Sequence, residues 1–251
     1  ELQFAAQYNA SRILDAALDR GTMLDAVFNR GFEQSPAIYS SAGVMSYRAL
    51  LEHVNRIANV LRHEMHLVPG NRVLIHASNS LTGMAAWWAV WRAGGVAVGT
   101  MPILRAVELQ IILGKAEISH ALVDHALAHE FEVARAASPK LTHVAYLGNG
   151  DLETHLARAA VEFDPVDTAA DDPALIAFTS GTTGNPKGCV HSHRDIAAMA
   201  ETFSRHILRP KPSDIFIGTP PLAFTFGLGA GVIFPASVGA AGAADGTDGA
   251  G

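Results

Sequence analysis

One run of glycines, hydroxyl residues and a lysine contains the residue types that could do chemistry. It reads FTSGTTGNPKG and extends from Phe178 to Gly188. Glycines allow backbone N–H groups to converge on an anion, hydroxyls add hydrogen-bond donors, and a lysine adds a full positive charge. Between a strand and a helix, this composition predicts a loop that binds phosphate groups. The candidate phosphate ligands are Thr179, Ser180, Gly181, Thr182, Thr183, Gly184 and Lys187.

This loop differs from the P-loop of the common nucleoside triphosphatases. In that motif a glycine is followed by four variable residues and then directly by Gly-Lys-Ser/Thr. Here Asn185 and Pro186 precede Lys187, and Gly188 stands where the magnesium-binding hydroxyl would be. The alternative is an ordinary glycine turn with a solvated lysine, which the length of the motif disfavours.

Alternating helical and apolar segments must position the loop. Apolar residues recur at helical spacing over residues 46–67, with Ser46 as a candidate N-cap. Short apolar segments typical of strands alternate with further helical segments, which indicates an α/β fold with parallel sheets flanked by helices. The expected strands are 72–77, 96–101, 120–124, 143–147, 174–179 and 214–218, and the expected helices are 81–93, 106–116, 127–137, 152–160 and 192–208.

Two aromatic residues in a second motif are candidates for a substrate pocket. The motif PPLAFTFGLG places Phe224 and Phe226 beside Gly227. Two rings next to a glycine could form a flat slot for an aromatic acid. The alternative is that both rings pack in the core, where phenylalanine is common. His193, which follows the loop, is a candidate contact for a substrate carboxylate or a phosphate, or else a capping or packing residue.

Composition excludes several other functions. The net charge of −6, with no basic block, argues against nucleic acid as a partner. A single cysteine, Cys189, rules out a disulfide within the chain, favours a cytoplasmic protein, and is expected to be a buried structural thiol. Prolines and glycines interrupt the uncharged run 215–244, so no membrane span is expected. The histidines lack metal-ligand spacing, so no protein metal site is expected.

The motifs resemble those of a known superfamily. Residues 179–188 resemble the signature loop of the adenylate-forming enzymes, which include acyl- and aryl-CoA ligases, luciferases and nonribosomal peptide adenylation domains. Residues 189–195 match the usual continuation, and residues 220–229 resemble the family's next motif. Weaker similarity extends over about residues 20–235. The combined motifs look closest to those of bacterial benzoate and 2-aminobenzoate CoA ligases.

The resemblance implies a two-step reaction that uses ATP, Mg²⁺ and coenzyme A. The loop would hold the β- and γ-phosphates while a carboxylate attacks the α-phosphorus, and CoA would then displace AMP. Phe224, Phe226 and Gly227 would line the pocket for an aryl carboxylate. A non-catalytic module that binds nucleotide or aryl acid, and a ligase for another carboxylic acid, are the alternatives.

The resemblance also implies a larger protein. Residues 1–235 correspond to part of an N-terminal AMP-binding domain, whereas the Ala- and Gly-rich residues 236–251 predict a disordered, low-complexity tail. The family's adenine motif, hinge and small C-terminal lid with its catalytic lysine have no counterpart in the sequence. No catalytic residue is therefore assigned, and we expect the chain alone to be inactive.

Overall fold

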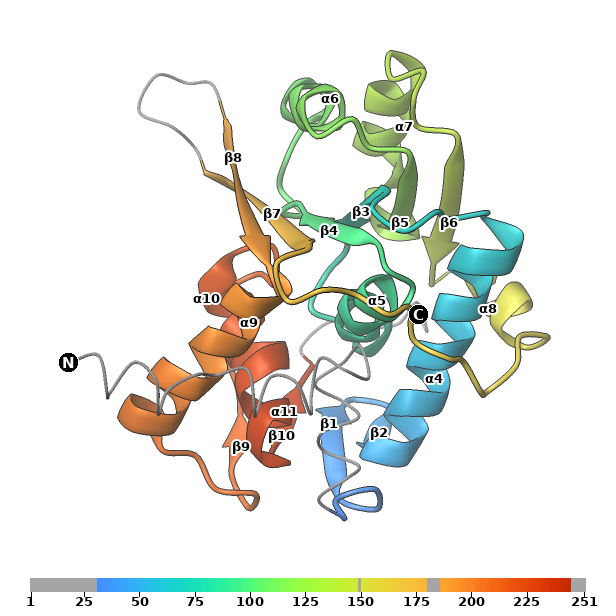
Figure 1. Cartoon of the computed structure of the whole chain (residues 1–251). Helices are drawn as coiled ribbons and strands as arrows, with labels where there is room; N and C mark the ends of the chain where they lie inside the picture. The colour runs from blue at the N-terminus through green and yellow to red at the C-terminus, as the bar shows by residue number, and fades with distance from the viewer. Residues whose placement is uncertain (1–30, 149, 180–185, 245–251) are drawn as a thin grey trace.

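The computed structural model describes residues 31–148, 150–179 and 186–244, which form two sheets flanked by helices (Figure 1). The larger sheet has the strand order β6-β5-β3-β4-β7-β8. Its strands are parallel except β8, which pairs antiparallel with β7. The bounds are β3 Arg72–His76, β4 Val96–Gly99, β5 His120–Asp124, β6 His143–Leu147, β7 Pro173–Thr179 and β8 Lys187–Ser192.

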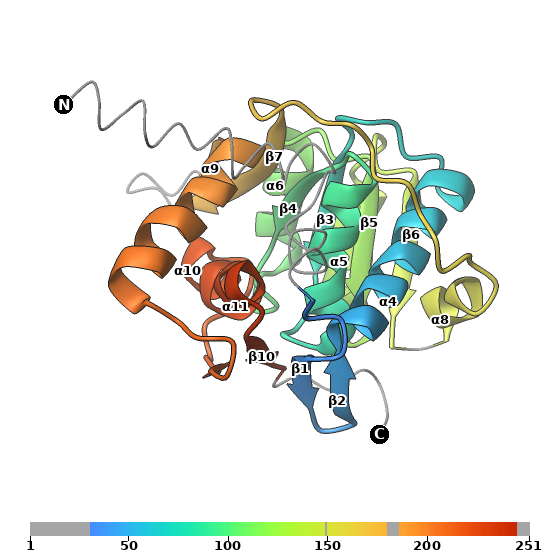
Figure 2. The ribbon, with the colours of Figure 1, turned by 60° about the horizontal axis from the view of Figure 1, so that its bottom comes forward.

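Helices cover both faces of this sheet, as the alternation of the sequence predicts (Figure 2). One core cluster joins α4, α5 and α8 to the sheet, and a second joins α6 and α7 to the opposite face. The helices are α4 Tyr47–Asn59, which continues as η1 Val60–Glu64, then α5 Leu81–Arg92, α6 Ala106–Lys115, η2 His125–Leu127, α7 Ala128–Ala136 and α8 Asp151–Leu156.

Local signals explain where these helices begin and how they pack. The Ser46 hydroxyl accepts a hydrogen bond from the Ala49 N–H at 3.2 Å, which confirms the predicted N-cap of α4. Helix α5 is buried on all sides, and its indole Trp91 Nε1 donates to the Ala174 carbonyl at 2.9 Å. A Cβ added at Gly99 would lie 2.6 Å from the Trp87 ring, so the strand β4 requires glycine there.

A smaller sheet lies below the larger one in the view of Figure 2 and has the order β2-β1-β10-β9. Strand β10 runs parallel to both of its neighbours, with Gly242 opposite Ile38 and also opposite Phe216. The bounds are β1 Pro36–Ser40, β2 Gly43–Ser46, β9 Ile215–Phe216 and β10 Ala241–Ala243, with helices α9 His193–Met199, η3 Ala200–Leu208, α10 Thr225–Leu228, η4 Gly229–Ile233 and α11 Phe234–Val238.

The predicted disordered tail is wrong for residues 236–244, which form the end of α11 and strand β10. This segment has few large side chains, but its neighbours bury it. The Tyr47 hydroxyl donates to the Ala240 carbonyl, and a Cβ at Gly242 would lie 2.9 Å from the Gly231 carbonyl oxygen. Backbone pairing at the centre of a sheet therefore orders a segment whose own side chains could not. Residues 245–251 lie outside the described residues.

Strand β8 and the cysteine on it also differ from the prediction. The sequence predicts a loop up to Gly188 and a helix from residue 192, whereas Lys187–Ser192 forms a strand that pairs with β7. Cys189 lies on this edge strand and is exposed, not buried. Edge strands have one unpaired side, so a polar-and-glycine segment can join a sheet without a hydrophobic pattern. Among the described residues, none of the helices is long and apolar enough to cross a membrane.

Candidate functional site

The predicted phosphate loop connects the two strands of a hairpin. Thr179 at the end of β7 is paired with Lys187 at the start of β8, and both side chains are exposed. Of the candidate ligands, Ser180, Gly181, Thr182, Thr183 and Gly184 lie outside the described residues. The structure therefore brings Thr179 and Lys187 together at the end of the hairpin, where the loop begins and ends.

Two contacts hold the base of this loop. Lys115, at the end of α6, donates from Nζ to the Pro186 carbonyl at 2.8 Å. A Cβ at Gly188 would lie 2.9 Å from a methyl carbon of Ile176, so the second strand of the hairpin packs closely on the first. Sequence reasoning missed Lys115, because a lysine in the last turn of a helix is usually a solvated residue. Its ammonium group adds a second positive charge beside the loop.

Helix α9 begins directly after the hairpin at a reciprocal cap. The Asp195 carboxylate accepts from the Ser192 N–H at 2.7 Å, and the Ser192 hydroxyl accepts from the Asp195 N–H at 3.3 Å. Two hydrogen bonds from Ser192 lower the pKa of Asp195, with the larger effect from the backbone N–H and the smaller from the hydroxyl. The cap fixes the direction in which α9 leaves β8, and with it the position of His193.

His193 occupies the first turn of α9 and is 6% exposed. The backbone N–H of His193 donates to the Asp172 carbonyl at 3.1 Å. Burial lowers the pKa of the imidazole, while the Asp172 carboxylate opposes this shift. A lowered pKa leaves the ring neutral at pH 7, so it can both donate and accept a hydrogen bond. Contact of His193 with a substrate stays a prediction.

The second motif presents its aromatic rings to solvent. Phe224 is 46% exposed and Phe226 is 66% exposed, so neither packs in the core of the described residues. Gly227 is buried, and a Cβ there would lie 2.2 Å from the Pro221 carbonyl oxygen. The adjoining cavity, which Gly227 lines, holds only about 10 Å³ and is not lined by either phenylalanine. An aryl pocket around these residues stays a prediction.

The motif is attached to the larger sheet by one side chain. Asn79, between β3 and α5, donates to the Pro220 carbonyl at 3.1 Å and accepts from the Leu222 N–H at 3.0 Å. These bonds join segments more than 140 residues apart. The asparagine amide satisfies both a carbonyl and an N–H of the turn, so it sets the position from which Phe224 and Phe226 project.

A buried histidine at the carboxyl edge of the larger sheet was missed by sequence reasoning. His76 ends β3, is 1% exposed, and pairs through Nδ1 with the Thr100 hydroxyl at 2.9 Å. Its Nε2 has no hydrogen-bond partner among the described residues. Burial lowers the pKa of His76 to about 4, against smaller opposing effects of Thr100 and Asp124. The only sequence signal was a histidine at the end of an apolar strand.

His76 lines a cavity of about 270 Å³ beyond the ends of β3, β4 and β5. Ligands of open α/β sheets bind at this edge of the strands. The Glu130 carboxylate accepts from the Ala106 N–H at 2.9 Å and pairs with Arg105 at 3.1 Å, and these contacts, in that order, lower the pKa of Glu130. The cavity is lined by His76, Pro102, Ile103, Leu104, Arg105, Ala126, Leu127, His129 and Glu130.

The described residues contain no group of three or more His, Cys, Asp or Glu side chains able to hold a metal ion. Magnesium prefers carboxylates, water and substrate phosphates as ligands. The donors brought together near the hairpin are the Thr179 hydroxyl and two lysines, and lysine does not bind magnesium at neutral pH. These residues do not fit the Mg²⁺ that the resemblance implies, so no step is derived through it.

The fold is that of the N-terminal part of the large α/β domain of adenylate-forming enzymes. A family model described as AMP-binding enzyme matches residues 26–245, and the chain belongs to this family. The match extends beyond residue 235, in agreement with the ordered strand β10.

Two curated relatives have different acids in their names. The chain is 31% identical over 202 residues to a benzoate–CoA ligase of Thauera aromatica, covering 79% of this chain and 38% of the ligase. It is 30% identical over 164 residues to a long-chain-fatty-acid–CoA ligase of Mycobacterium tuberculosis, covering 65% of this chain and 32% of that enzyme. The chain thus spans about a third of the length of these relatives, 38% of the first and 32% of the second.

Solved structures share the fold. An anthranilate CoA ligase in complex with anthranoyl-AMP superposes with a TM-score of 0.82 at 23% identity, covering 88% of this chain and 43% of that chain. ATP-bound MatB of Rhodopseudomonas palustris superposes with a TM-score of 0.80 at 28% identity, covering 89% of this chain and 45% of that chain.

Proposed function

We propose that this protein contributes the phosphate-binding part of an AMP-forming ligase that joins an aryl carboxylic acid, benzoate or 2-aminobenzoate, to coenzyme A in the cytoplasm. The observation that carries the proposal is the hairpin that sets Thr179 opposite Lys187 at the two ends of the glycine- and hydroxyl-rich loop. Supporting it, the benzoate–CoA ligase is 31% identical, and a structural neighbour binds ATP.

The proposed reaction has two steps. A carboxylate oxygen attacks the α-phosphorus of ATP, the bond from that phosphorus to the bridging oxygen breaks, and pyrophosphate leaves. The CoA thiolate then attacks the acyl carbon, and AMP leaves with the former carboxylate oxygen. The Lys187 ammonium and the loop N–H groups hold the β- and γ-phosphates, on which negative charge increases as pyrophosphate leaves. Lys115 keeps the base of the loop in place through the Pro186 carbonyl.

The exposed rings of Phe224 and Phe226 support an aryl acid. Flat rings at a solvent-accessible turn, beside the close-packed Gly227, suit stacking on another aromatic ring better than packing along a long alkyl chain. The fatty-acid relative at 30% identity supports the second candidate, a ligase for an aliphatic acid.

Titration calorimetry of the 251-residue chain with ATP tests the role of the loop. Lys187→Gln should weaken ATP binding by about tenfold or more, because a charge-assisted contact to phosphate is lost. Lys140→Gln is the matched control: it removes the same charge from a lysine that is paired with the Glu117 carboxylate. Equal ATP affinity in the wild type and Lys187→Gln would reject the phosphate role.

Thermal shifts with non-hydrolysable adenylates test the acid. A benzoyl or 2-aminobenzoyl adenylate analogue should raise the melting temperature more than a long-chain alkyl analogue, and Phe224→Ala should remove the difference. A larger shift with the alkyl analogue would favour the aliphatic candidate.

A further inference from the structure

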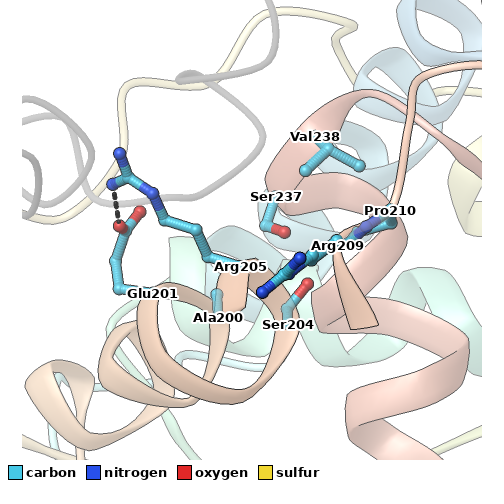
Figure 3. A pocket seen from close by; sticks show the side chains of 8 residues that line it. All are labelled: Ala200, Glu201, Ser204, Arg205, Arg209, Pro210, Ser237 and Val238. Carbon is cyan, nitrogen blue, oxygen red and sulfur yellow. Dashed lines mark hydrogen bonds and ion pairs between the residues drawn. The ribbon is translucent and has the colours of Figure 1, made fainter. Parts of the chain in front are cut away.

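A cavity separate from the hairpin lies between the end of η3 and the end of α11 (Figure 3). Its volume of about 420 Å³ is in the range of small-molecule pockets. The proposed reaction uses none of its residues. The cavity is lined by Ala200, Glu201, Ser204, Arg205, Arg209, Pro210, Ser237 and Val238.

Ser204 provides a buried polar group without a partner. The residue is fully buried, and its hydroxyl oxygen has no hydrogen-bond partner among the described residues. A serine in the last turns of a helix often bonds to a carbonyl of the preceding turn, but this one does not. An unsatisfied buried hydroxyl destabilises the fold unless something bonds to it. Ser204 lines the cavity, so a ligand there can supply the missing bond.

Arg209 is held in place at the mouth of the same cavity. Its backbone is left-handed, with φ of 51°, and its N–H donates to the Ser204 carbonyl at 2.8 Å. Its Nε donates to the His206 carbonyl at 3.1 Å, which leaves the two terminal nitrogens for other acceptors. Figure 3 shows the guanidinium group reaching between Ser204 and Ser237. Within the described ranges it forms no ion pair with a carboxylate.

The other side chains leave the cavity with a positive charge. Glu201 is paired with Arg205 at 2.9 Å, so these two charges offset each other and the Arg209 charge has no counterpart in the lining. The Ser237 hydroxyl donates to the Phe234 carbonyl at 2.7 Å. Ala200, Pro210 and Val238 are the apolar residues of the lining.

We propose that this cavity binds a small organic anion, with a carboxylate or phosphate ester held by the Arg209 guanidinium and the Ser204 hydroxyl. The planar guanidinium suits a two-pronged contact with either anionic group, and the hydroxyl donates a third hydrogen bond. The cavity is larger than a bare phosphate ion needs, and its apolar lining residues can contact the carbon skeleton of the ligand. The site is independent of the proposed ATP loop.

Titration calorimetry of the 251-residue chain with glycerol 3-phosphate and with succinate tests this site. We expect at least one of the two probes to bind, and Arg209→Gln to weaken that binding by about tenfold or more. The matched control is Arg135→Gln on α7, which removes the same charge from an arginine paired with Glu132. Arg209→Gln should leave ATP binding unchanged, whereas Lys187→Gln should leave probe binding unchanged. The experiment can therefore refute the anion-binding proposal and the ATP-binding proposal independently of each other.

The variant Ser204→Ala distinguishes a binding role of the hydroxyl from a purely structural one, because the two roles predict different changes in melting temperature and probe affinity. Removing an unsatisfied hydroxyl should leave the melting temperature unchanged or raise it, yet weaken probe binding by about tenfold. Three results would overturn the proposal: neither probe binds at millimolar concentration, Arg209→Gln binds as the wild type does, or Lys187→Gln alone abolishes probe binding. A lower melting temperature in Ser204→Ala, with probe affinity unchanged, would show that the hydroxyl serves packing and would also overturn it.

Discussion

Helices α5 and η3 both carry large apolar side chains, but those of α5 are buried and those of η3 are exposed. In α5, Trp87, Trp88 and Trp91 are at most 4% exposed. In η3, Phe203 is 43% exposed and Ile207 is 69% exposed. Helix α5 lies between the larger sheet and α4 (Figure 1). Helix η3 follows the hairpin and α9 in the chain and lies at the surface.

The same contrast separates two regions of the molecule. The first region, residues 47–147, contains strands β3 to β6 and their helices, and its strands β3, β4 and β5 are almost fully buried. The second region, residues 173–244, contains the hairpin, the exposed Phe224 and Phe226, and the cavity at Arg209. The hairpin, the two exposed rings and the anion cavity thus lie where side chains remain accessible. The buried His76 and the cavity that it lines belong to the first region.

The largest effect is expected from breaking the core of the first region. Trp87→Ala should lower the free energy of unfolding by about 3–5 kcal/mol, because it leaves a cavity between α5 and β4. Ile217→Ala, which truncates a side chain that is 82% exposed, should change it by less than about 0.5 kcal/mol. Urea denaturation measures both. Similar losses in the two variants would show that the regions do not differ in packing.

The pH dependence of stability should also come from the first region. Burial lowers the pKa of His76 from 6.5 to about 4, so between these values the unfolded chain binds the proton and the folded chain does not. Stability should therefore fall as the pH drops from about 6.5 to 4, by up to about 3 kcal/mol from this group.

Denaturation at a series of pH values checks this, with His76→Asn as the test variant. The variant should flatten the pH dependence, whereas His63→Asn, at an exposed position, should not. If the free energy of unfolding of His76→Asn depends on pH as strongly as that of the wild type, other buried groups cause the effect. His193 is one such group, because burial lowers its pKa in the same direction.

In the second region, backbone crowding should reverse a usual helix preference. Alanine normally stabilises a helix by about 1 kcal/mol relative to glycine. Gly227→Ala should instead destabilise by about 1–3 kcal/mol, because its Cβ would lie 2.2 Å from the Pro221 carbonyl oxygen. Gly218→Ala is the control, since its Cβ would make only an ordinary contact of 3.4 Å with Pro220. Thermal unfolding of both variants distinguishes crowding from loss of flexibility.

The smallest expected effects come from two helix caps, one in each region. Ser46→Ala, at the start of α4, should cost about 1 kcal/mol of global stability. Ser192→Ala should mainly raise amide hydrogen exchange within α9, because the second region buries less of its surface and opens more locally. Hydrogen-exchange mass spectrometry separates the two results. Faster exchange in α4 upon Ser192→Ala would mean that both regions open as one unit.

Local patterns predicted most elements of the first region. Strands β5 and β6 have the expected bounds, and α5 and α6 differ from expectation by one residue at their ends. Short apolar strands and helical periodicity suffice there, because each element buries a face that its own residues define. The glycine-rich loop was recognised for the same reason: its residue types carry the signal without any tertiary contact.

The second region was predicted less well, because its elements depend on neighbours far away in the chain. Strand β8 joins the sheet as an antiparallel edge opposite β7, and β10 inserts between β1 and β9 although it consists of alanine and glycine. Neither has a hydrophobic pattern of its own. His76 and Ser204 are equally invisible in sequence, because an unsatisfied buried polar atom is defined by what surrounds it.

The sequence by itself determined the α/β class, the positions of the helices and strands of the first region, and the loop at residues 179–188, because these follow from periodicity and residue chemistry within short segments. Tertiary structure alone decided the strand order, the antiparallel pairing of β7 with β8, the exposure of Phe224 and Phe226, and the cavity between η3 and α11. These features join residues from separate segments, and contacts of that kind are set by the packing of the whole domain.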